Sequence, residues 1–105
     1  MEEVIVYNKI VRTVQELLPG SSVLLFGSRA RGDHNKHSDY DLLIITPRTF
    51  TSKEKIFWAN LLDRAIVEAI GAPIDLLLNS EEEVYQKKEL PGHIIRTVLW
   101  EGLRL

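Results

Sequence analysis

Three acidic residues of this chain are spaced so that two strands can bring them together. Asp39 and Asp41 stand one residue apart at the start of an apolar run, and strand side chains alternate, so both carboxylates fall on one face. Asp75 lies inside a second apolar run, where an unpaired acid is costly. If the two runs are neighbouring strands, the three carboxylates offer hard oxygen ligands, which favour Mg²⁺ or Mn²⁺ over zinc. Such a site is able to align a triphosphate with an attacking hydroxyl.

A less specific interpretation of Asp39 and Asp41 alone is a polar strand start with two solvated acids. The Gly27-Ser28 pair argues for the metal-site interpretation, because it directly follows another apolar run. Glycine there allows a tight turn that exposes N–H groups and a hydroxyl to an anion. The segment matches neither the P-loop pattern G-x-x-x-x-G-K-[ST] nor the dinucleotide pattern with G-x-G. Arg29 and Arg31 flank the turn and are candidates to contact phosphate, although Arg29 equally fits a surface arginine on a short helix.

The remaining polar and aromatic residues favour structural interpretations. His34 and His37 lie in a polar segment that lacks the further ligands a zinc site needs, so solvated histidines are the better interpretation. Ser38 is expected to bond the turn backbone and steady the acid that follows it. Trp58 and Trp100 are more typical of core or interface positions than of nucleotide stacking.

Hydrophobic periodicity predicts the elements that must position these residues. Thr51 with Glu54, and Ser80 with Glu83, have the form of capping boxes that open helices. The polar stretch 27–38 is long for a connection in so small a domain, which is a functional hint. The expected order is a helix over 3–18, strands over 23–26 and 41–46, a helix from Thr51 to Gly71, a strand over 73–78, a short helix from Ser80 and a last helical segment from Ile94.

This order predicts an α/β (α+β) fold, with a small mixed β-sheet flanked by helices and its first two strands antiparallel. The 105 residues, 45% of them hydrophobic, suffice for a single domain spanning 1–105. The absence of cysteine excludes disulfides, thiol catalysis and thiolate zinc sites. The apolar runs are too short to span a membrane, and Glu2 and Glu3 stand where a signal peptide would be basic, so a cytoplasmic location is expected. A net charge of -2 argues against strong nucleic-acid binding.

Taken together, Gly27-Ser28, Asp39-x-Asp41 and Asp75 resemble the signature of the DNA polymerase beta nucleotidyltransferase superfamily. The run GSxARG followed by SDxDL, in so short a chain, is most similar to the minimal nucleotidyltransferases, the MNT proteins of prokaryotic HEPN/MNT toxin-antitoxin pairs. The resemblance covers most of the chain, including the closing Trp100-Glu101-Gly102 segment. It implies a nucleotidyltransferase-like fold.

The resemblance also implies a role for each matching residue. Gly27 and Ser28 match the pair that holds the β- and γ-phosphates of ATP, and Asp39 and Asp41 match the acids that hold two Mg²⁺ ions, with Mn²⁺ as a substitute. Asp75 matches the third acid, which binds the catalytic metal and helps to deprotonate the acceptor hydroxyl.

Two further positions follow from the same motif. Arg31 stands where the GSxARG run usually has arginine, and Gly32 would let the chain pass close to the nucleotide. The implied activity is transfer of AMP from ATP to a hydroxyl, with a tyrosine of a small helical HEPN toxin as acceptor and an antitoxin role for this chain.

The alternative is a non-catalytic antitoxin or scaffold that binds a HEPN partner and keeps a vestigial nucleotide site. The three intact acids argue against that alternative. The net charge of -2 disfavours a nucleic-acid-modifying enzyme. An antibiotic as the acceptor is disfavoured because the chain has no room for an obvious drug-binding domain. The apolar tail around Trp100, Leu103 and Leu105 fits packing on the chain's own sheet, on a second copy in a homo-oligomer or on a partner.

Overall fold

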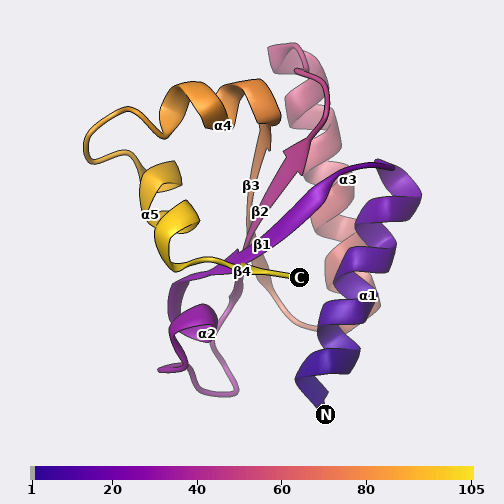
Figure 1. Cartoon of the computed structure of the whole chain (residues 1–105). Coiled ribbons are helices and arrows are strands. Elements are labelled where there is room, and N and C mark those ends of the chain that lie inside the picture. Colours follow the sequence, from indigo (N-terminus) through magenta and orange to yellow (C-terminus); the bar gives the residue numbers. More distant parts are fainter. Residues whose placement is uncertain (1) are drawn as a thin grey trace.

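The computed structural model describes residues 2–105 and shows one mixed sheet between two layers of helices (Figure 1). The sheet order is β3-β2-β1-β4. The strand β1 runs antiparallel to both β2 and β4, whereas β2 and β3 are parallel. The elements are α1 (Glu2–Leu17), β1 (Ser22–Phe26), α2 (Gly27–Arg31), β2 (Tyr40–Thr46), α3 (Ser52–Ile70), β3 (Ile74–Ser80), α4 (Glu81–Lys87), α5 (Ile94–Glu101) and β4 (Leu103–Arg104). The predicted fold class and the antiparallel pairing of the first two strands are confirmed.

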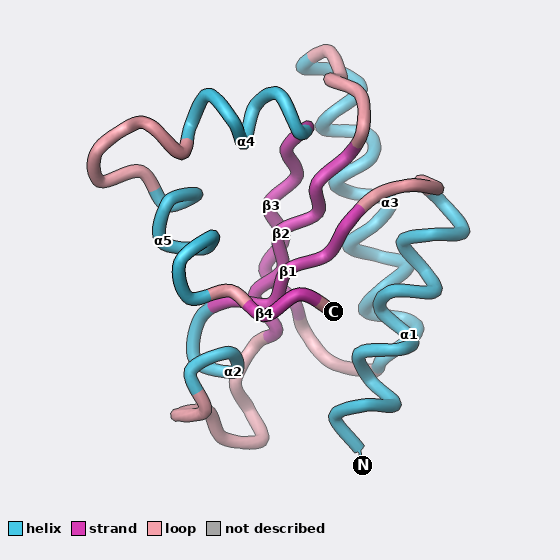
Figure 2. The backbone as a smooth tube through the Cα atoms, viewed as in Figure 1, coloured by secondary structure: helices cyan, strands magenta, loops and turns pink. Residues whose placement is uncertain are grey.

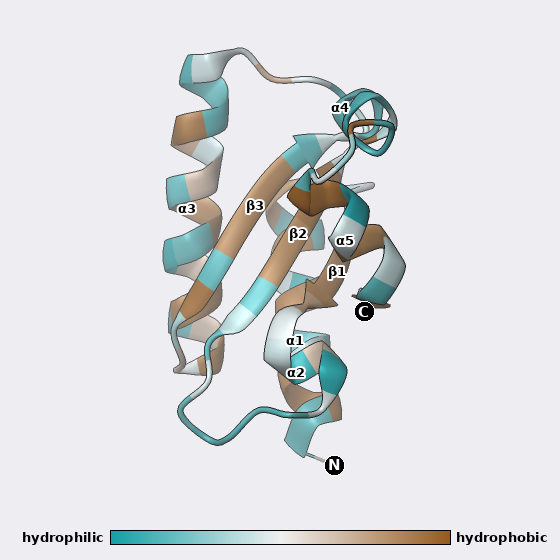
Figure 3. Cartoon of the chain, turned by 90° about the vertical axis from the view of Figure 1, so that its left-hand side faces the viewer, coloured by the Kyte–Doolittle hydropathy of each residue, from teal (hydrophilic) through white to brown (hydrophobic). Residues whose placement is uncertain are grey.

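Alternate side chains of the central strand β2 serve two separate cores. Leu42 and Ile44 are fully buried beneath α1 and α3, with Ile10 and Leu62 among their cluster. Leu43 points to the other face, where it packs in a smaller cluster beneath α4 and α5. Both faces of β2 are therefore covered along its middle, as the continuous apolar run predicts. Figure 3 shows hydrophilic bands crossing β2 and β3 toward the end that lies next to α2.

Both predicted capping boxes are present and set the starts of α3 and α4. Thr51 Oγ1 accepts a hydrogen bond from Glu54 N at 3.2 Å, while Thr51 N donates to Glu54 Oε1 at 2.9 Å. Ser80 and Glu83 make the same reciprocal pair at 3.1 and 2.8 Å. These bonds satisfy N–H groups that the first helical turn leaves without partners.

Two short elements lie outside what hydrophobic periodicity predicts. The segment Gly27–Arg31 forms the helix α2 inside the predicted polar connection, where the sequence suggests a short helix only as one setting for Arg29. Its last turn is closed by a bond from Gly32 N to Ser28 O at 2.9 Å. The strand β4 has two residues, too few for a period to show, and pairs with β1 (Figure 2).

Pairing of β4 answers the question of where the apolar tail packs. Leu105 N donates to Val23 O at 3.0 Å, and the Leu105 side chain packs against the larger core. The tail therefore lies on the chain's own sheet, although Trp100 beside it remains 91% exposed. Across residues 2–105, every helix is too short or too polar to cross a membrane.

Candidate active site

Asp41 and Asp75 occupy opposite positions on the parallel strands β2 and β3. They are register partners, so their Cα atoms face each other across one ladder step. Because side chains alternate along a strand, both acids lie on the face of Leu43 and Leu77, the face covered farther along by α4 and α5. Asp39 is exposed two residues before Asp41, in the segment that leads into β2. The structure thus places the three predicted acids at one end of two neighbouring strands.

The predicted burial of Asp75 is wrong. The side chain is exposed because β3 begins at Ile74, so Asp75 is only the second residue of the strand. The fully buried residues of β3 lie at its other end. Burial therefore does not require Asp75 to be paired. What singles out Asp75 is its register with Asp41.

The carboxyl group of Asp41 stands in an environment that disfavours its charge. Burial raises the pKa of Asp41 above its ordinary value, the negative charges of Asp75 and Asp39 raise it further, and the positive charge of Arg31 opposes them. Like charges at this spacing favour the bound state of a cation that neutralises them.

Gly27 brings the backbone against Asp41 with no side chain between them. Its φ of +72° is a left-handed conformation that other residues rarely adopt. A Cβ built on Gly27 would overlap the Asp41 carboxylate. Phe26, the residue before Gly27, pairs with Asp41 across the antiparallel ladder, which fixes this approach. The Gly27-Ser28 turn and the Asp41 carboxylate are therefore immediate neighbours.

Arg31 contacts two acids in the structure. Its Nη1 lies 3.4 Å from Glu101 Oε1, and its Nε lies 3.4 Å from Asp33 Oδ2. The same Glu101 oxygen accepts a 3.4 Å hydrogen bond from Gly27 N, the first amide of α2. Sequence analysis assigned no role to Glu101, because its partners lie 70 and 74 positions earlier in the chain and only the fold brings them together.

Gly32 ends α2 in a left-handed conformation, with φ of +84°, and a Cβ there would meet nothing within 4 Å. The backbone conformation alone accounts for this glycine. Ser28 follows Gly27 as the second residue of α2 and is half-buried.

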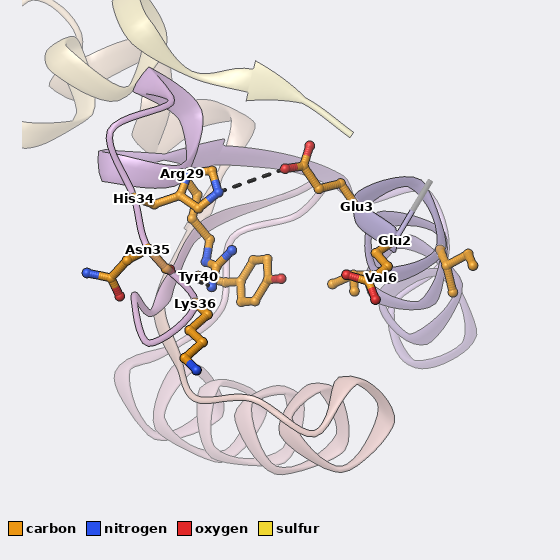
Figure 4. Close-up of a pocket in the computed structure, with 9 residues that line it drawn as sticks. Glu2, Glu3, Val6, Arg29, His34, Asn35, Lys36 and Tyr40 are labelled. Atoms are coloured by element: carbon orange, nitrogen blue, oxygen red, sulfur yellow. Dashed lines mark hydrogen bonds and ion pairs between the residues drawn. The ribbon is translucent and has the colours of Figure 1, made fainter.

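His34 lies apart from the three acids, against α1, and His37 is exposed. His34 Nε2 lies 3.8 Å from Glu3 Oε1 of α1, and both residues line a cavity of about 500 Å³ with Arg29 and Tyr40 (Figure 4). None of the three acids lines this cavity. Ser38 has the structural role expected of it, since its Oγ accepts a hydrogen bond from Asn35 N at 3.1 Å.

The donor set suits a hard divalent cation, although it is not closed around one. Among residues 2–105, no three acidic or histidine side chains stand close enough together to enclose a metal as they are. Asp39 and Asp75 are exposed and free to change rotamer, while Asp41 between them carries an unfavourable charge. Three carboxylates at one end of two neighbouring strands are oxygen donors of the kind that Mg²⁺ or Mn²⁺ prefers.

A family model described as a nucleotidyltransferase domain matches residues 7–98. This range includes the Gly-Ser turn, all three acids and every strand except β4. The chain belongs to the nucleotidyltransferase domain family, which confirms the family predicted from the motifs.

Similar proteins include one curated relative and several solved structures. The Probable protein adenylyltransferase MntA of Haemophilus influenzae is 42% identical over 50 residues, which are 45% of this chain and 44% of that protein. The match thus spans less than half the length of this relative. A solved structure described as a minimal nucleotidyltransferase superposes with a TM-score of 0.66 at 21% identity, covering 99% of this chain and 95% of the other.

A third similar protein comes from a complex. The solved structure of a tri-AMPylated Shewanella oneidensis HEPN toxin with its MNT antitoxin contains a chain that matches with a TM-score of 0.59 and 16% identity. The match covers 99% of this chain and 71% of that one. At these identities, the two structural likenesses establish the fold.

Proposed function

We propose that this domain transfers AMP from ATP to a hydroxyl group, using two divalent ions, Mg²⁺ or Mn²⁺, held by Asp39, Asp41 and Asp75. The observation that carries this proposal is the register of Asp41 with Asp75, together with the direct approach of Gly27 to Asp41. A turn with backbone amide donors and a group of hard oxygen ligands are the two parts that phosphoryl chemistry on a triphosphate needs.

The chain's own groups then divide the task. The Gly27-Ser28 turn, with Arg31 and Gly32, is proposed to receive the β- and γ-phosphates, which requires Arg31 to exchange one carboxylate contact for phosphate. Asp75 is proposed to face the acceptor and to help remove its proton. The acceptor oxygen forms a bond to the α-phosphorus, the bond from that phosphorus to the bridging oxygen breaks, and pyrophosphate leaves. The bound ions would neutralise the triphosphate and the leaving pyrophosphate.

The proposed acceptor is a tyrosine of a small helical HEPN protein, whose toxicity this modification would suppress. Support comes from the AMPylated HEPN toxin in the similar complex and from the adenylyltransferase name of the Haemophilus influenzae relative. Within residues 2–105, all the elements belong to one sheet and its covering helices, and we propose that a separate protein presents the hydroxyl to this domain. We place the pair in the cytoplasm, where ATP and Mg²⁺ are supplied.

A second candidate is a non-catalytic antitoxin that acts by binding alone. Two observations favour it: the acids within residues 2–105 form no closed metal cluster, and Arg31 is already paired with Glu101 and Asp33. Both arrangements can change when a nucleotide binds. Grouped acids that raise the pKa of Asp41 favour the catalytic proposal, because a domain that only binds a partner does not require them.

The deciding experiment incubates the co-purified domain and HEPN partner with α-labelled ATP and Mg²⁺. We expect label on the partner, and its loss in the double variant Asp39→Asn with Asp41→Asn. Asp63→Asn is the matched control, since Asp63 is an exposed acid on α3, outside the site. A stable complex that never becomes labelled would leave the binding-only function in place.

A further inference from the structure

We infer that Arg29 is a positioning residue that fixes Asp39 relative to the Gly-Ser turn; this rests on the proposed function of that site. Arg29 belongs to α2 and directly follows Ser28. Asp39 belongs to the segment that leads into β2.

The guanidinium of Arg29 contacts both chain neighbours of Asp39. Its Nε donates a hydrogen bond to Ser38 O at 2.9 Å, on the residue before Asp39. Its guanidinium carbon lies 3.9 Å from the centre of the Tyr40 ring, on the residue after Asp39. A third contact joins Arg29 Nη2 to Asn35 O at 3.4 Å, farther back in the same segment.

These contacts direct Arg29 away from the phosphate side of α2. Tyr40 is buried in the core beneath α1 and α3, the face of the sheet opposite to the acids. Figure 4 shows the Arg29 side chain running to the Tyr40 ring, beside the cavity that His34 and Glu3 line. Arg29 is therefore neither a phosphate ligand in this arrangement nor a solvated surface residue, the two roles its sequence position suggested.

Asp39 needs such support more than the other two acids do. Asp41 and Asp75 lie within paired strands, whereas Asp39 lies before β2 begins, where its backbone is outside the sheet ladder. The nearest ladder-like bond is from Tyr40 N to Pro73 O at 3.2 Å. A carboxylate on an unsupported backbone would sample many positions, and metal affinity falls when groups behind a ligand stop orienting it.

The geometry requires arginine rather than any cation. The planar guanidinium stacks on a ring while donating hydrogen bonds in several directions from its edge, whereas an ammonium group has no planar face and is a compact point charge. Lysine at position 29 would keep the charge and lose part of the contact set. It should therefore restore only part of what a neutral side chain loses.

The test compares Arg29→Met and Arg29→Lys with the matched variant Arg48→Met. Arg48 follows the opposite end of β2 and likewise stacks on an aromatic ring, with its guanidinium carbon 4.4 Å from the centre of the Phe50 ring. Two measurements need no catalysis: amide hydrogen exchange of residues 33–40 in the free protein, and Mn²⁺ binding followed by the loss of its free-ion electron-spin signal. The third is the Mg²⁺ concentration that gives half-maximal AMP transfer.

We expect Arg29→Met to speed exchange across 33–40 and to weaken Mn²⁺ binding and raise the Mg²⁺ requirement by about 10-fold or more. Arg29→Lys should fall between Arg29→Met and wild type, and Arg48→Met should leave all three readouts unchanged. If wild type transfers AMP and Arg29→Met shows unaltered exchange and metal binding, the positioning role is overturned. An inactive wild type whose exchange still responds to Arg29→Met would instead count against the proposed function alone.

Discussion

The two ends of strands β2 and β3 differ in how their polar side chains are surrounded. At the end where β3 runs into α4, buried polar residues have partners: Ser80 Oγ lies 2.7 Å from Thr49 Oγ1, and Asn79 Oδ1 accepts a hydrogen bond from Lys87 Nζ at 2.6 Å. At the other end, the charges of Asp75 and Asp39 raise the pKa of Asp41 in addition to its burial. At the first end these polar side chains are paired within the protein, whereas at the other end the charges of the acids oppose one another.

This difference separates stability from function along a single pair of strands. Changes at the paired end should lower the free energy of unfolding and leave metal and nucleotide binding intact. Removing a carboxylate at the acidic end should abolish function while stability stays level or rises, because loss of a like charge relieves repulsion.

The largest effect is expected for Asp41→Asn. It removes the central carboxylate of the acidic end, so AMP transfer should fall by more than about 100-fold. This loss exceeds the one typically caused by mutating residues that only orient a metal ligand. Because the pKa of Asp41 is raised, its ionised form destabilises the folded state at neutral pH, and thermal unfolding should show an equal or higher midpoint. A clear loss of stability would contradict the proposed division between the two ends.

Gly27→Ala comes next, because it combines a left-handed backbone with a collision against Asp41. We expect a loss of roughly 2–4 kcal/mol in the free energy of unfolding by urea titration, with weaker metal binding. Gly71→Ala is the control, since Gly71 ends α3 at φ of +68° with open space around its Cα. Its loss should be roughly 1–2 kcal/mol, from the backbone alone. Equal losses in the two variants would show that the approach to Asp41 does not matter.

At the paired end, Ser80→Ala removes both a helix cap and the contact with Thr49. The expected loss is about 1–2 kcal/mol, measured by urea unfolding. Titration with Mn²⁺ should give the same affinity as wild type. A change in that affinity would mean that the two ends are coupled through β3.

The smallest effect concerns Glu83 and pH. Burial acts to raise the pKa of Glu83, but hydrogen bonds from Lys55 and the Ser80 amide outweigh it and hold the pKa below its ordinary value. The ionised form therefore stabilises the fold above about pH 4.3, the unfolded value, and this contribution disappears as pH falls through the lowered pKa.

Glu83→Gln should accordingly lower stability by under about 1 kcal/mol at pH 7. Thermal unfolding of both proteins across a pH series gives the comparison. The difference should shrink on acidification, and one that grew toward low pH would contradict the assigned role.

Sequence reasoning reaches the parts of this fold that repeat over many residues. The strand β2 and the helix α3 carry long apolar patterns, and Thr51 and Ser80 have capping partners three residues on, so their starts can be predicted. The five-residue α2 and the two-residue β4 are too short to show a period.

The site divides in the same way. Asp39, Asp41 and Asp75 follow from a motif, and the structure brings them to one end of the sheet. The exposure of Asp75 depends on where β3 begins, which composition does not determine. The contact of Glu101 with the first amide of α2 depends on the packing of α5, so no local pattern encodes it.

The absence of a side chain at Gly27 also affects the distance between the turn and Asp41. Phe26 is held opposite Asp41 by the strand ladder, and Gly27 continues that backbone directly into the turn. The distance between the turn and the Asp41 backbone is therefore set by the strand ladder, and no side chain on Gly27 adds a rotatable bond between them. The main chain of this small domain thus fixes where the turn lies relative to the strand that carries Asp41.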